Sequence, residues 1–188
     1  MKAVWYEGFG PAGEVLVHGD MAVPEPGEGE VLVRLHASGV NPSDVKARAV
    51  ARPGSVMAFP RIVPQSDGAG VIEAVGAGVD AARVGQRVWI WNGQWRRQFG
   101  TAAQFIALPA DQAVFLPDGT SLTEAACFGI PAMTAWTAVL GDGPVEGQTV
   151  LVTGGAGTVG RYAVQMARLA GAEVITTVSS PEKAAHAG

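Results

Sequence analysis

The clearest pattern of apolar and polar positions in this chain lies between Thr149 and Ser180. Residues 150–152 form a short apolar run rich in valine, as expected for a strand buried on both faces of a parallel sheet. Glycines follow at once, residues 162–170 favour a helix that stops at a glycine, and residues 173–178 form a second β-like run. The pattern therefore predicts a strand, a glycine turn, a helix and a second strand.

The turn of this unit has the spacing of a dinucleotide-binding motif. In GxGxxG the first glycine permits a tight turn, the second lets the backbone approach a pyrophosphate, and the third lets the helix pack on the strand. The helix N-terminus also offers N–H groups and a positive dipole end to phosphates. A plain glycine loop is the alternative in a chain with 26 glycines, but the flanking elements favour the dinucleotide site. The cofactor-binding residues predicted here are Gly154, Gly155, Ala156, Gly157, Thr158, Val159 and Gly160.

The end of the second strand bears on which dinucleotide binds. A site for NAD has a carboxylate about 20 residues after the turn that binds the ribose 2′-hydroxyl, and residues 174–181 contain no Asp or Glu. Ser179, Ser180 and Lys183 stand where a 2′-phosphate would bind and offer hydroxyl donors and a cation. They favour NADP(H). Ser180 followed by Pro181 is also typical of a helix N-terminus, which explains the segment without any ligand.

The region before residue 120 has a different pattern, with short β-like runs separated by Gly and Pro. Residues 31–37 and 87–91 are examples, and such runs predict an all-β barrel or sandwich. Residues 121–124 read Ser-Leu-Thr-Glu, a capping box that begins a helix. We therefore expect a β-rich domain over 1–120 and a doubly wound domain over 121–188.

Composition and charge narrow the class of partner. The chain has 188 residues and a formal net charge of −4 without a basic run, so nucleic acid is not an expected partner. No apolar stretch approaches the roughly 20 residues that span a bilayer, and no signal peptide is recognisable, so we expect no membrane association and a cytoplasmic location. The single cysteine, Cys127, excludes an internal disulfide and is expected to be buried in an Ala-rich helix.

Several stretches, taken in their order along the chain, resemble a known superfamily. They are residues 37–44 (ASGVNPSD), 67–76 (DGAGVIEAVG), 85–88 (GQRV), 132–135 (AMTA) and the turn at 154–160. The chain resembles the medium-chain dehydrogenase/reductase superfamily, specifically its zinc-free quinone oxidoreductase branch, often called zeta-crystallin-like. The resemblance covers the whole chain, which corresponds to only about the first half of a family member. It implies a GroES-like β-barrel domain followed by the first part of a doubly wound (Rossmann) domain.

The resemblance also bears on metal binding. In zinc-dependent members a Cys, a His and a Cys hold the catalytic zinc, and those positions carry Asn41, Ser66 and Ile130 here. None of them is a suitable ligand for a tetrahedral zinc site. The histidines of the chain are His18, His36 and His186. They do not stand at metal-ligand spacing, so no metal is expected.

The activity that the resemblance implies is hydride transfer from NADP(H) to a quinone or an activated enone. Such a reaction needs the nicotinamide near the acceptor carbon and a hydrogen-bond donor for the acceptor oxygen. By position in the family motifs, Asn41 is the predicted catalytic amide donor, and Thr134 is the predicted catalytic contact near the nicotinamide. The alternatives are a turn role for Asn41 before Pro42 and a bond from Thr134 to its own helix backbone.

Three further residues are candidate substrate contacts. Lys46 stands where several quinone reductases carry a tyrosine, and it either binds an anionic substrate or is a solvated surface lysine. Trp91 and Trp95 belong to the Trp-rich segment 89–97. That segment either forms an aromatic wall for a flat quinone or covers the barrel end as core.

A second hypothesis is a truncated, non-catalytic fragment that binds nucleotide weakly or acts as an interaction module. Two strands of the doubly wound domain are recognisable, whereas a complete domain has about six, with the dinucleotide lying across them. Full-length relatives are expected to be homodimers that act on a small-molecule substrate. The sequence therefore predicts what the turn binds more firmly than whether this chain alone is active.

Overall fold

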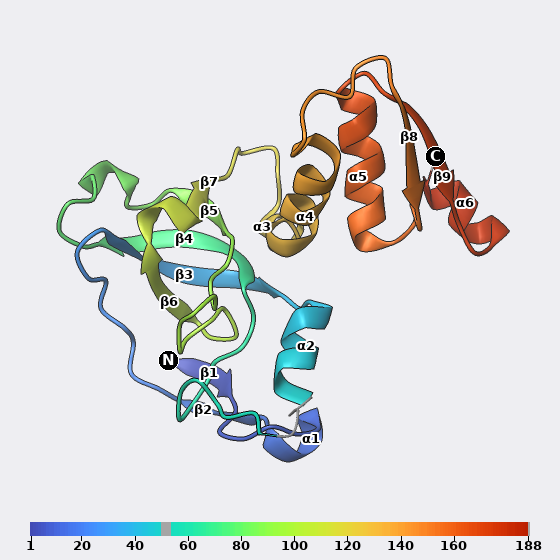
Figure 1. Cartoon of the computed structure of the whole chain (residues 1–188). Coiled ribbons are helices and arrows are strands. Elements are labelled where there is room, and N and C mark those ends of the chain that lie inside the picture. The colour runs from blue at the N-terminus through green and yellow to red at the C-terminus, as the bar shows by residue number, and fades with distance from the viewer. Residues whose placement is uncertain (50–53, 188) are drawn as a thin grey trace. The chain divides into compact units, whose positions relative to one another are not determined.

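The computed structural model describes residues 1–49 and 54–187, the last two by their backbone alone. These residues divide into two compact units, Met1–Gly129 and Ile130–Gly188 (Figure 1). The division lies beyond the boundary at 120/121 that the sequence indicates. The short helix α3 (Leu122–Ala125) contacts strands of the first unit, and its buried alanines pack there in one apolar cluster with Ala69 and Leu116. Helix α3 therefore belongs to the β-rich unit.

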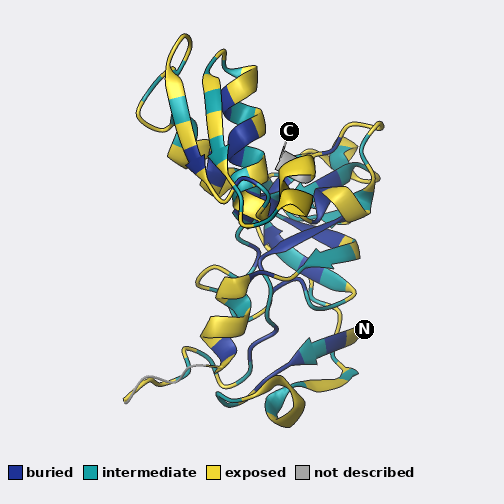
Figure 2. Ribbon diagram, turned by 90° about the vertical axis from the view of Figure 1, so that its right-hand side faces the viewer, coloured by how far each residue is buried: buried dark blue, intermediate teal, exposed yellow. Residues whose placement is uncertain are grey.

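The first unit is built on a five-stranded antiparallel sheet in the order β6-β3-β4-β5-β7. The strands are β3 (Glu30–Gly39), β4 (Asp67–Val75), β5 (Arg87–Ile90), β6 (Phe105–Pro109) and β7 (Ala113–Phe115). Buried residues alternate with less buried ones along β5 and β6. Apolar side chains from all five strands form the main core, and the buried parts of the sheet are dark blue in Figure 2. The fully buried members of that core include Val31, Val33, Ile72, Val88, Ile90, Ile106 and Leu108.

The pairing of β3 with β4 positions part of the candidate site. The last residue of β3, Gly39, lies opposite the first residue of β4, Asp67. The register shifts between Leu35 and Ala37, an irregularity that bends a strand. A Cβ at Gly39 would overlap the Ala126 carbonyl oxygen and fall 3.0 Å from the Asp67 Cβ, so only glycine fits at this position. The chain that leaves β3 therefore passes directly beside Asp67.

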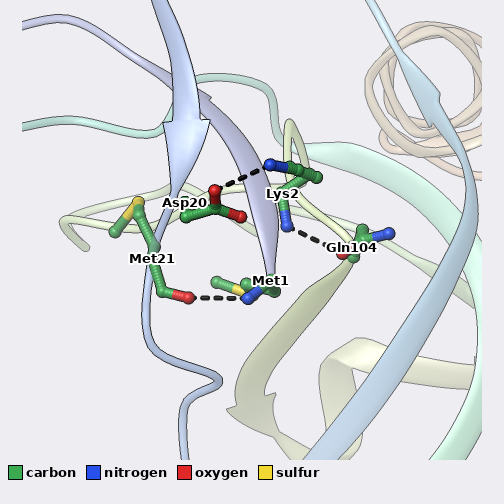
Figure 3. A network of polar contacts seen from close by, with 5 residues as sticks. All are labelled: Met1, Lys2, Asp20, Met21 and Gln104. Carbon is green, nitrogen blue, oxygen red and sulfur yellow. Dashed lines mark hydrogen bonds and ion pairs between the residues drawn. The ribbon is translucent and has the colours of Figure 1, made fainter.

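The N-terminus is held by a two-stranded antiparallel ribbon, β1 (Lys2–Trp5) with β2 (Val17–Asp20). Figure 3 shows how the ends of the ribbon are joined. The Met1 amino group donates to the Met21 carbonyl (2.7 Å), and Lys2 Nζ pairs with Asp20 Oδ2 (2.7 Å). The Lys2 amide donates to Gln104 Oε1 (2.7 Å), which ties the ribbon to the chain before β6.

Short helices connect the strands of the first unit. They are α1 (Ala12–Val15), α2 (Pro42–Ala49), and the 3₁₀ turns η1 (Ala81–Arg83) and η2 (Ala110–Gln112). Among them α2 matters most for the site, because it begins immediately after Asn41. No helix in the described part of the chain is both long and apolar enough to cross a membrane.

The second unit contains the predicted strand, turn, helix and strand. Its elements are α4 (Gly129–Leu140), β8 (Thr149–Thr153), α5 (Thr158–Leu169), β9 (Glu173–Thr177) and α6 (Pro181–Ala187). Strands β8 and β9 are parallel, with Val152 opposite Thr176. Helix α5 buries Ala163 and Val164 against Val152. It begins at Thr158, four residues earlier than the pattern suggests, because the glycine turn itself ends as the helix N-terminus.

One expectation about this unit is wrong. Strand β8 was expected to be buried on both faces, but Leu151 is 64% exposed and its neighbour on β9, Ile175, is 53% exposed. Only the face with Val152 is covered among the described residues, by α5 and α4. The apolar run is real, but an apolar run by itself does not say which of its faces is covered.

Candidate functional site

The glycine turn is tied to the end of β9. The Gly155 amide donates to the Thr177 carbonyl (3.0 Å), and the Gly154 amide donates to Thr177 Oγ1 (3.2 Å). Gly154 has a φ of 72°, a left-handed conformation that glycine adopts without strain. Gly157 then takes the N-cap position of α5. The turn is thus held at the carboxyl ends of both strands, the edge where open α/β sheets bind ligands.

The three motif glycines have different surroundings. A Cβ at Gly155 would overlap Thr176 Oγ1, and a Cβ at Gly160 would overlap the Gly154 carbonyl oxygen. Both glycines are therefore required for the packing of turn, strand and helix. A Cβ at Gly157 would lie 3.2 Å from the Gly154 oxygen, and no other described residue outside its chain neighbours and its own helix comes within 4 Å of it. Gly157 is consequently the position where the backbone is open to a ligand.

A cavity of ≈ 380 Å³ opens beside this turn. Its lining residues are Gly154, Ala156, Gly157, Thr177, Val178, Ser179 and Lys183. The structure thus brings two segments that the sequence singled out, the glycine turn and the start of α6, to one cavity. Gly155, Thr158, Val159, Gly160 and Ser180, also predicted as contacts, are not among the lining residues. Thr177 and Val178 were missed, although their place at the end of the second strand is a signal that sequence reasoning can use.

The segment from Ser179 to Lys183 has both of the roles that the sequence allows. Ser180 Oγ accepts from the Lys183 amide (3.4 Å), so it caps α6. Its hydrogen bond to Glu182 also lowers the pKa of that carboxyl. The Lys183 ammonium takes no part in the cap and donates instead to Ser179 Oγ (2.9 Å). The cap therefore accounts for Ser180 and leaves the side chains of Ser179 and Lys183 at the cavity.

Asn41 lies in the first unit, at the N-cap position of α2. Its backbone oxygen accepts from the Asp44 amide (3.0 Å), so the turn role holds for its backbone. Its side chain is buried, with 6% of the residue exposed, and Nδ2 donates to Asp67 Oδ2 (2.8 Å). Asp67 was missed in the sequence. An acidic residue at the head of the apolar strand β4 is the signal that points to it.

Asp44 is a second acidic neighbour of Asn41. Its Oδ2 accepts from the Asn41 amide N–H (2.7 Å). Partial burial raises the pKa of the Asp44 carboxyl, and the hydrogen bond from Asn41 opposes that shift. Burial likewise raises the pKa of Tyr6, which also feels the charges of Arg48 and Asp44. The start of α2 is therefore a partly buried polar region.

Thr134 lies on α4 in the second unit. Its hydroxyl donates to the Ile130 carbonyl (2.6 Å), one turn earlier in the same helix. This is the helix-backbone bond that the sequence left as the alternative. In the structure, Thr134 is thus exposed and bonded within its own helix.

Asn41 and Ser66 stand at positions that the resemblance described above equates with zinc ligands. Asn41 is bonded to Asp67, and Ser66 is buried, with 8% exposed. Within residues 1–49 and 54–187, no three His, Cys, Asp or Glu residues gather in a group that would hold a metal ion; the side chain of His186 lies outside the described part. The expectation of a buried Cys127 is wrong. Cys127 is exposed in the turn between α3 and α4, where its Sγ lies 3.7 Å from the Thr123 carbonyl.

The candidate substrate contacts of the first unit lie in separate surroundings. Lys46 is exposed on α2. Trp89 packs edge-on against Phe128, with ring centroids 6.1 Å apart. Trp91 Nε1 donates to the Asp111 carbonyl (3.3 Å), whereas Trp95 is 61% exposed and lies under the Arg96 guanidinium at 5.5 Å. The Trp-rich segment therefore contributes one ring to packing and exposes another.

Arg97 fastens the end of that segment. One of its terminal nitrogens, Nη2, donates to Gln112 Oε1 and to the Asn92 carbonyl. Its other terminal nitrogen is buried and has no hydrogen-bond partner among the residues that the structure describes, and burial lowers the pKa of the guanidinium. Arg97 thus anchors the loop that follows β5 to η2.

Comparison with known proteins identifies the family. Residues 27–118 match the alcohol dehydrogenase GroES-like domain, and nearly the whole chain matches quinone oxidoreductases. The chain belongs to the medium-chain dehydrogenase/reductase superfamily. The expected architecture of a GroES-like domain followed by part of a doubly wound domain is confirmed.

Relatives within this superfamily include a human quinone oxidoreductase that is 37% identical over 186 residues, which are 97% of this chain and 54% of the relative. A mycobacterial structure complexed with NADPH is 36% identical with a TM-score of 0.81, covering 100% of this chain and 56% of the other. An NAD-dependent alcohol dehydrogenase is 34% identical with a TM-score of 0.86, covering 100% and 60%. The chain thus spans about half the length of the curated relatives it matches.

Proposed function

We propose that this member of the superfamily takes part in NADPH-dependent hydride transfer to a quinone or an activated enone, without zinc. The observation that carries the proposal is the cavity in which the glycine turn meets Ser179 and Lys183. The motif backbone suits a pyrophosphate, and the ammonium of Lys183 with the hydroxyl of Ser179 suits an additional phosphate.

The preference for NADPH over NADH rests on charge. Residues 174–181 contain no carboxylate to bind a ribose 2′-hydroxyl. Lys183 and Ser179, joined by a hydrogen bond of 2.9 Å, line the same cavity as Gly157. A 2′-phosphate would meet a cation and a hydroxyl there, whereas the 2′-hydroxyl of NADH would bring no negative charge to the cation. The NADPH complex of a mycobacterial relative agrees with this preference.

The glycine turn is suited to hold the diphosphate part of the cofactor. Gly157 is open to solvent and stands at the N-terminus of the 12-residue helix α5. The first N–H groups of a helix have no partner within the helix and carry the positive end of its dipole. When bound, NADPH supplies the hydride. The chain's own part in this unit is to bind and orient the anionic end of the cofactor.

In the first unit, Asn41 is the proposed hydrogen-bond donor to the oxygen of the acceptor. A quinone or enone accepts hydride at carbon, and its oxygen gains negative charge as the hydride arrives, so a donor at that oxygen stabilises the transition state. The residues at the zinc positions, Asn41 and Ser66, offer hydrogen bonds and not metal ligands of the usual kind. The quinone oxidoreductase relatives support this class of acceptor.

Two measurements on the 188-residue chain test the proposal. Titration of intrinsic fluorescence with NADPH and NADH should show tighter binding of NADPH, and equal affinities would contradict the 2′-phosphate assignment. Oxidation of NADPH should depend on an added quinone such as 1,4-naphthoquinone and should persist in the presence of a metal chelator. Loss of that activity with the chelator, and its return with zinc, would contradict the metal-free mechanism.

A further inference from the structure

Asp67 is a carboxyl group held in the interior of the first unit. It is 1% exposed, and its backbone oxygen accepts from Thr101 Oγ1 (2.6 Å) and Ser38 Oγ (3.4 Å). A Cβ at Gly129 would overlap Asp67 Oδ1, so the chain passes very close to the carboxyl group. A buried carboxyl is costly unless it is hydrogen-bonded. Asp67 is therefore a residue whose position the surrounding backbone specifies closely.

The side chain of Asn41 is diverted from the role that its position suggests. An Asn at an N-cap normally accepts a hydrogen bond from the second or third helical N–H through its side-chain oxygen. Here the Asp44 N–H binds the backbone oxygen of Asn41 (3.0 Å), and Asp44 Oδ2 accepts from the Asn41 N–H (2.7 Å). The first turn of the helix is thus hydrogen-bonded without the side-chain amide of Asn41. That side-chain amide points inward and donates to Asp67 Oδ2 (2.8 Å).

An ionised carboxylate accepts hydrogen bonds and cannot donate them. The bond from Asn41 Nδ2 to Asp67 Oδ2 (2.8 Å) is the arrangement that an ionised Asp67 favours, because the opposite face of the amide would bring Oδ1 against a second acceptor. The amide nitrogen has two hydrogens, of which one is used by Asp67. Because the amide group is planar, the bond to Asp67 also fixes the direction of the second hydrogen on Nδ2.

We infer that Asp67 is a positioning residue, which holds the amide of Asn41 so that its remaining N–H is presented to the oxygen of the hydride acceptor. The inference rests on the proposed function, in which Asn41 is the donor. Asp67 touches neither cofactor nor substrate in this scheme and acts on the reaction through Asn41. The orientation of the pair is what distinguishes this role from a merely structural hydrogen bond.

Exchange of the Asn41 and Asp67 side chains distinguishes a positioning role for Asp67 from a merely structural hydrogen bond. Asn41→Asp and Asp67→Asn are made singly and together in the 188-residue chain. The double variant keeps the hydrogen bond and the net charge but reverses the direction of the bond, since the amide now stands at position 67. It therefore removes the donor that Asn41 presents to the acceptor. Thr101→Val is the matched control, because it removes a buried hydrogen bond to the Asp67 backbone and leaves both side chains in place.

Thermal unfolding reports on the pair itself. Each single variant should lower Tm by about 5 °C, and the double variant should recover most of that loss. Binding of 1,4-naphthoquinone, followed by quenching of tryptophan fluorescence, should remain about tenfold weaker in the double variant. Its kcat/KM for NADPH-dependent reduction of the quinone should remain lower by on the order of 100-fold. The Thr101→Val variant should lose stability without either change.

Each other outcome contradicts the inference in a recognisable way. Recovery of both stability and quinone reduction in the double variant would show that the direction of the bond is irrelevant and that the pair is only structural. If the loss of Tm in the double variant equalled the sum of the losses in the two single variants, the residues would not act as a pair. Wild-type chain that binds NADPH but neither binds nor reduces the quinone would overturn the proposed acceptor and the donor role together, while the unfolding data would still report the pair.

Discussion

Lys183 Nζ donates a hydrogen bond to Ser179 Oγ at 2.9 Å, across the N-terminus of α6 and at the rim of the cavity that the glycine turn lines. The bond spans the residue that caps the helix, Ser180, without involving the Ser180 hydroxyl. Cap and cation are therefore separable by substitution, although they lie within a few residues of each other.

The variant Lys183→Ala should weaken NADPH binding about tenfold and leave NADH binding unchanged, because a charge-assisted contact to the 2′-phosphate is lost. Lys183→Arg should retain most of the affinity. Fluorescence titration with both nucleotides measures the change. Ser180→Ala is the control for the helix cap: it should lower the stability of α6 and should not alter the preference between nucleotides. If Ser180→Ala selectively weakened NADPH binding and Lys183→Ala did not, the phosphate contact would belong to Ser180 and not to Lys183.

Alanine substitutions at two motif glycines should have opposite effects on folding and binding. In Gly160→Ala the added Cβ would overlap the Gly154 carbonyl oxygen, and we expect a loss of about 2 kcal/mol or more that outweighs the gain in helix propensity of about 1 kcal/mol. In Gly157→Ala the loss of stability should stay under about 1 kcal/mol. That variant should nevertheless weaken NADPH binding at least tenfold, because the Cβ stands where the pyrophosphate approaches the backbone.

Chemical denaturation and nucleotide titration of the same two glycine variants check this division. If Gly157→Ala unfolded as easily as Gly160→Ala, Gly157 would not lie on the open side of the turn. If Gly157→Ala bound NADPH as well as the unchanged chain, the pyrophosphate would not approach the backbone at Gly157.

The stability of the first unit should depend on the ionisation of Asp44. Burial raises the pKa of this carboxyl in the folded chain above its unfolded value. Its contribution to stability is therefore fully present below the unfolded pKa of about 3.9 and is lost as pH rises through the higher folded pKa. Asp44→Asn removes this ionisation and keeps an oxygen that can accept from the Asn41 N–H.

Relative to the unchanged chain, Asp44→Asn should thus become progressively more stable between about pH 4 and pH 7. Thermal unfolding of both proteins across that range measures the difference. A difference that shrinks as pH rises would mean that the hydrogen bond from Asn41 outweighs burial and that the pKa of Asp44 is lowered instead.

Two tryptophans of the segment 89–97 should differ in their contribution to stability. Trp89 packs on Phe128 beside the apolar cluster of Ala69 and Leu116, so Trp89→Ala should cost about 3 kcal/mol. Trp95 is 61% exposed, and Trp95→Ala should change the free energy of unfolding by no more than about 0.5 kcal/mol. Urea unfolding measures both values. Weaker naphthoquinone binding in Trp95→Ala at unchanged stability would support the aromatic-wall interpretation for that ring.

The sequence by itself determined the strand, glycine turn, helix and strand between Thr149 and Thr177, and the bonding choices open to Thr134. These features depend on neighbours in the chain: the periodicity of apolar residues, the conformational freedom of glycine, and the short reach of a threonine hydroxyl to its own helix. For the same reason the sequence correctly proposed that Ser180 begins a helix. Local rules suffice where both partners of an interaction lie within one or two turns.

Only the tertiary structure decided what binds the side chain of Asn41, where Cys127 lies, and which face of β8 is covered. Asn41 and Asp67 are 26 residues apart, and they meet because β3 pairs with β4 so that Gly39 lies opposite Asp67. Likewise, Leu151 and Val152 are equally apolar in the sequence, but α5 packs on one of them alone. Strand pairing and the side on which a helix packs are set by contacts between distant segments, and the order of residues along a single strand does not contain them.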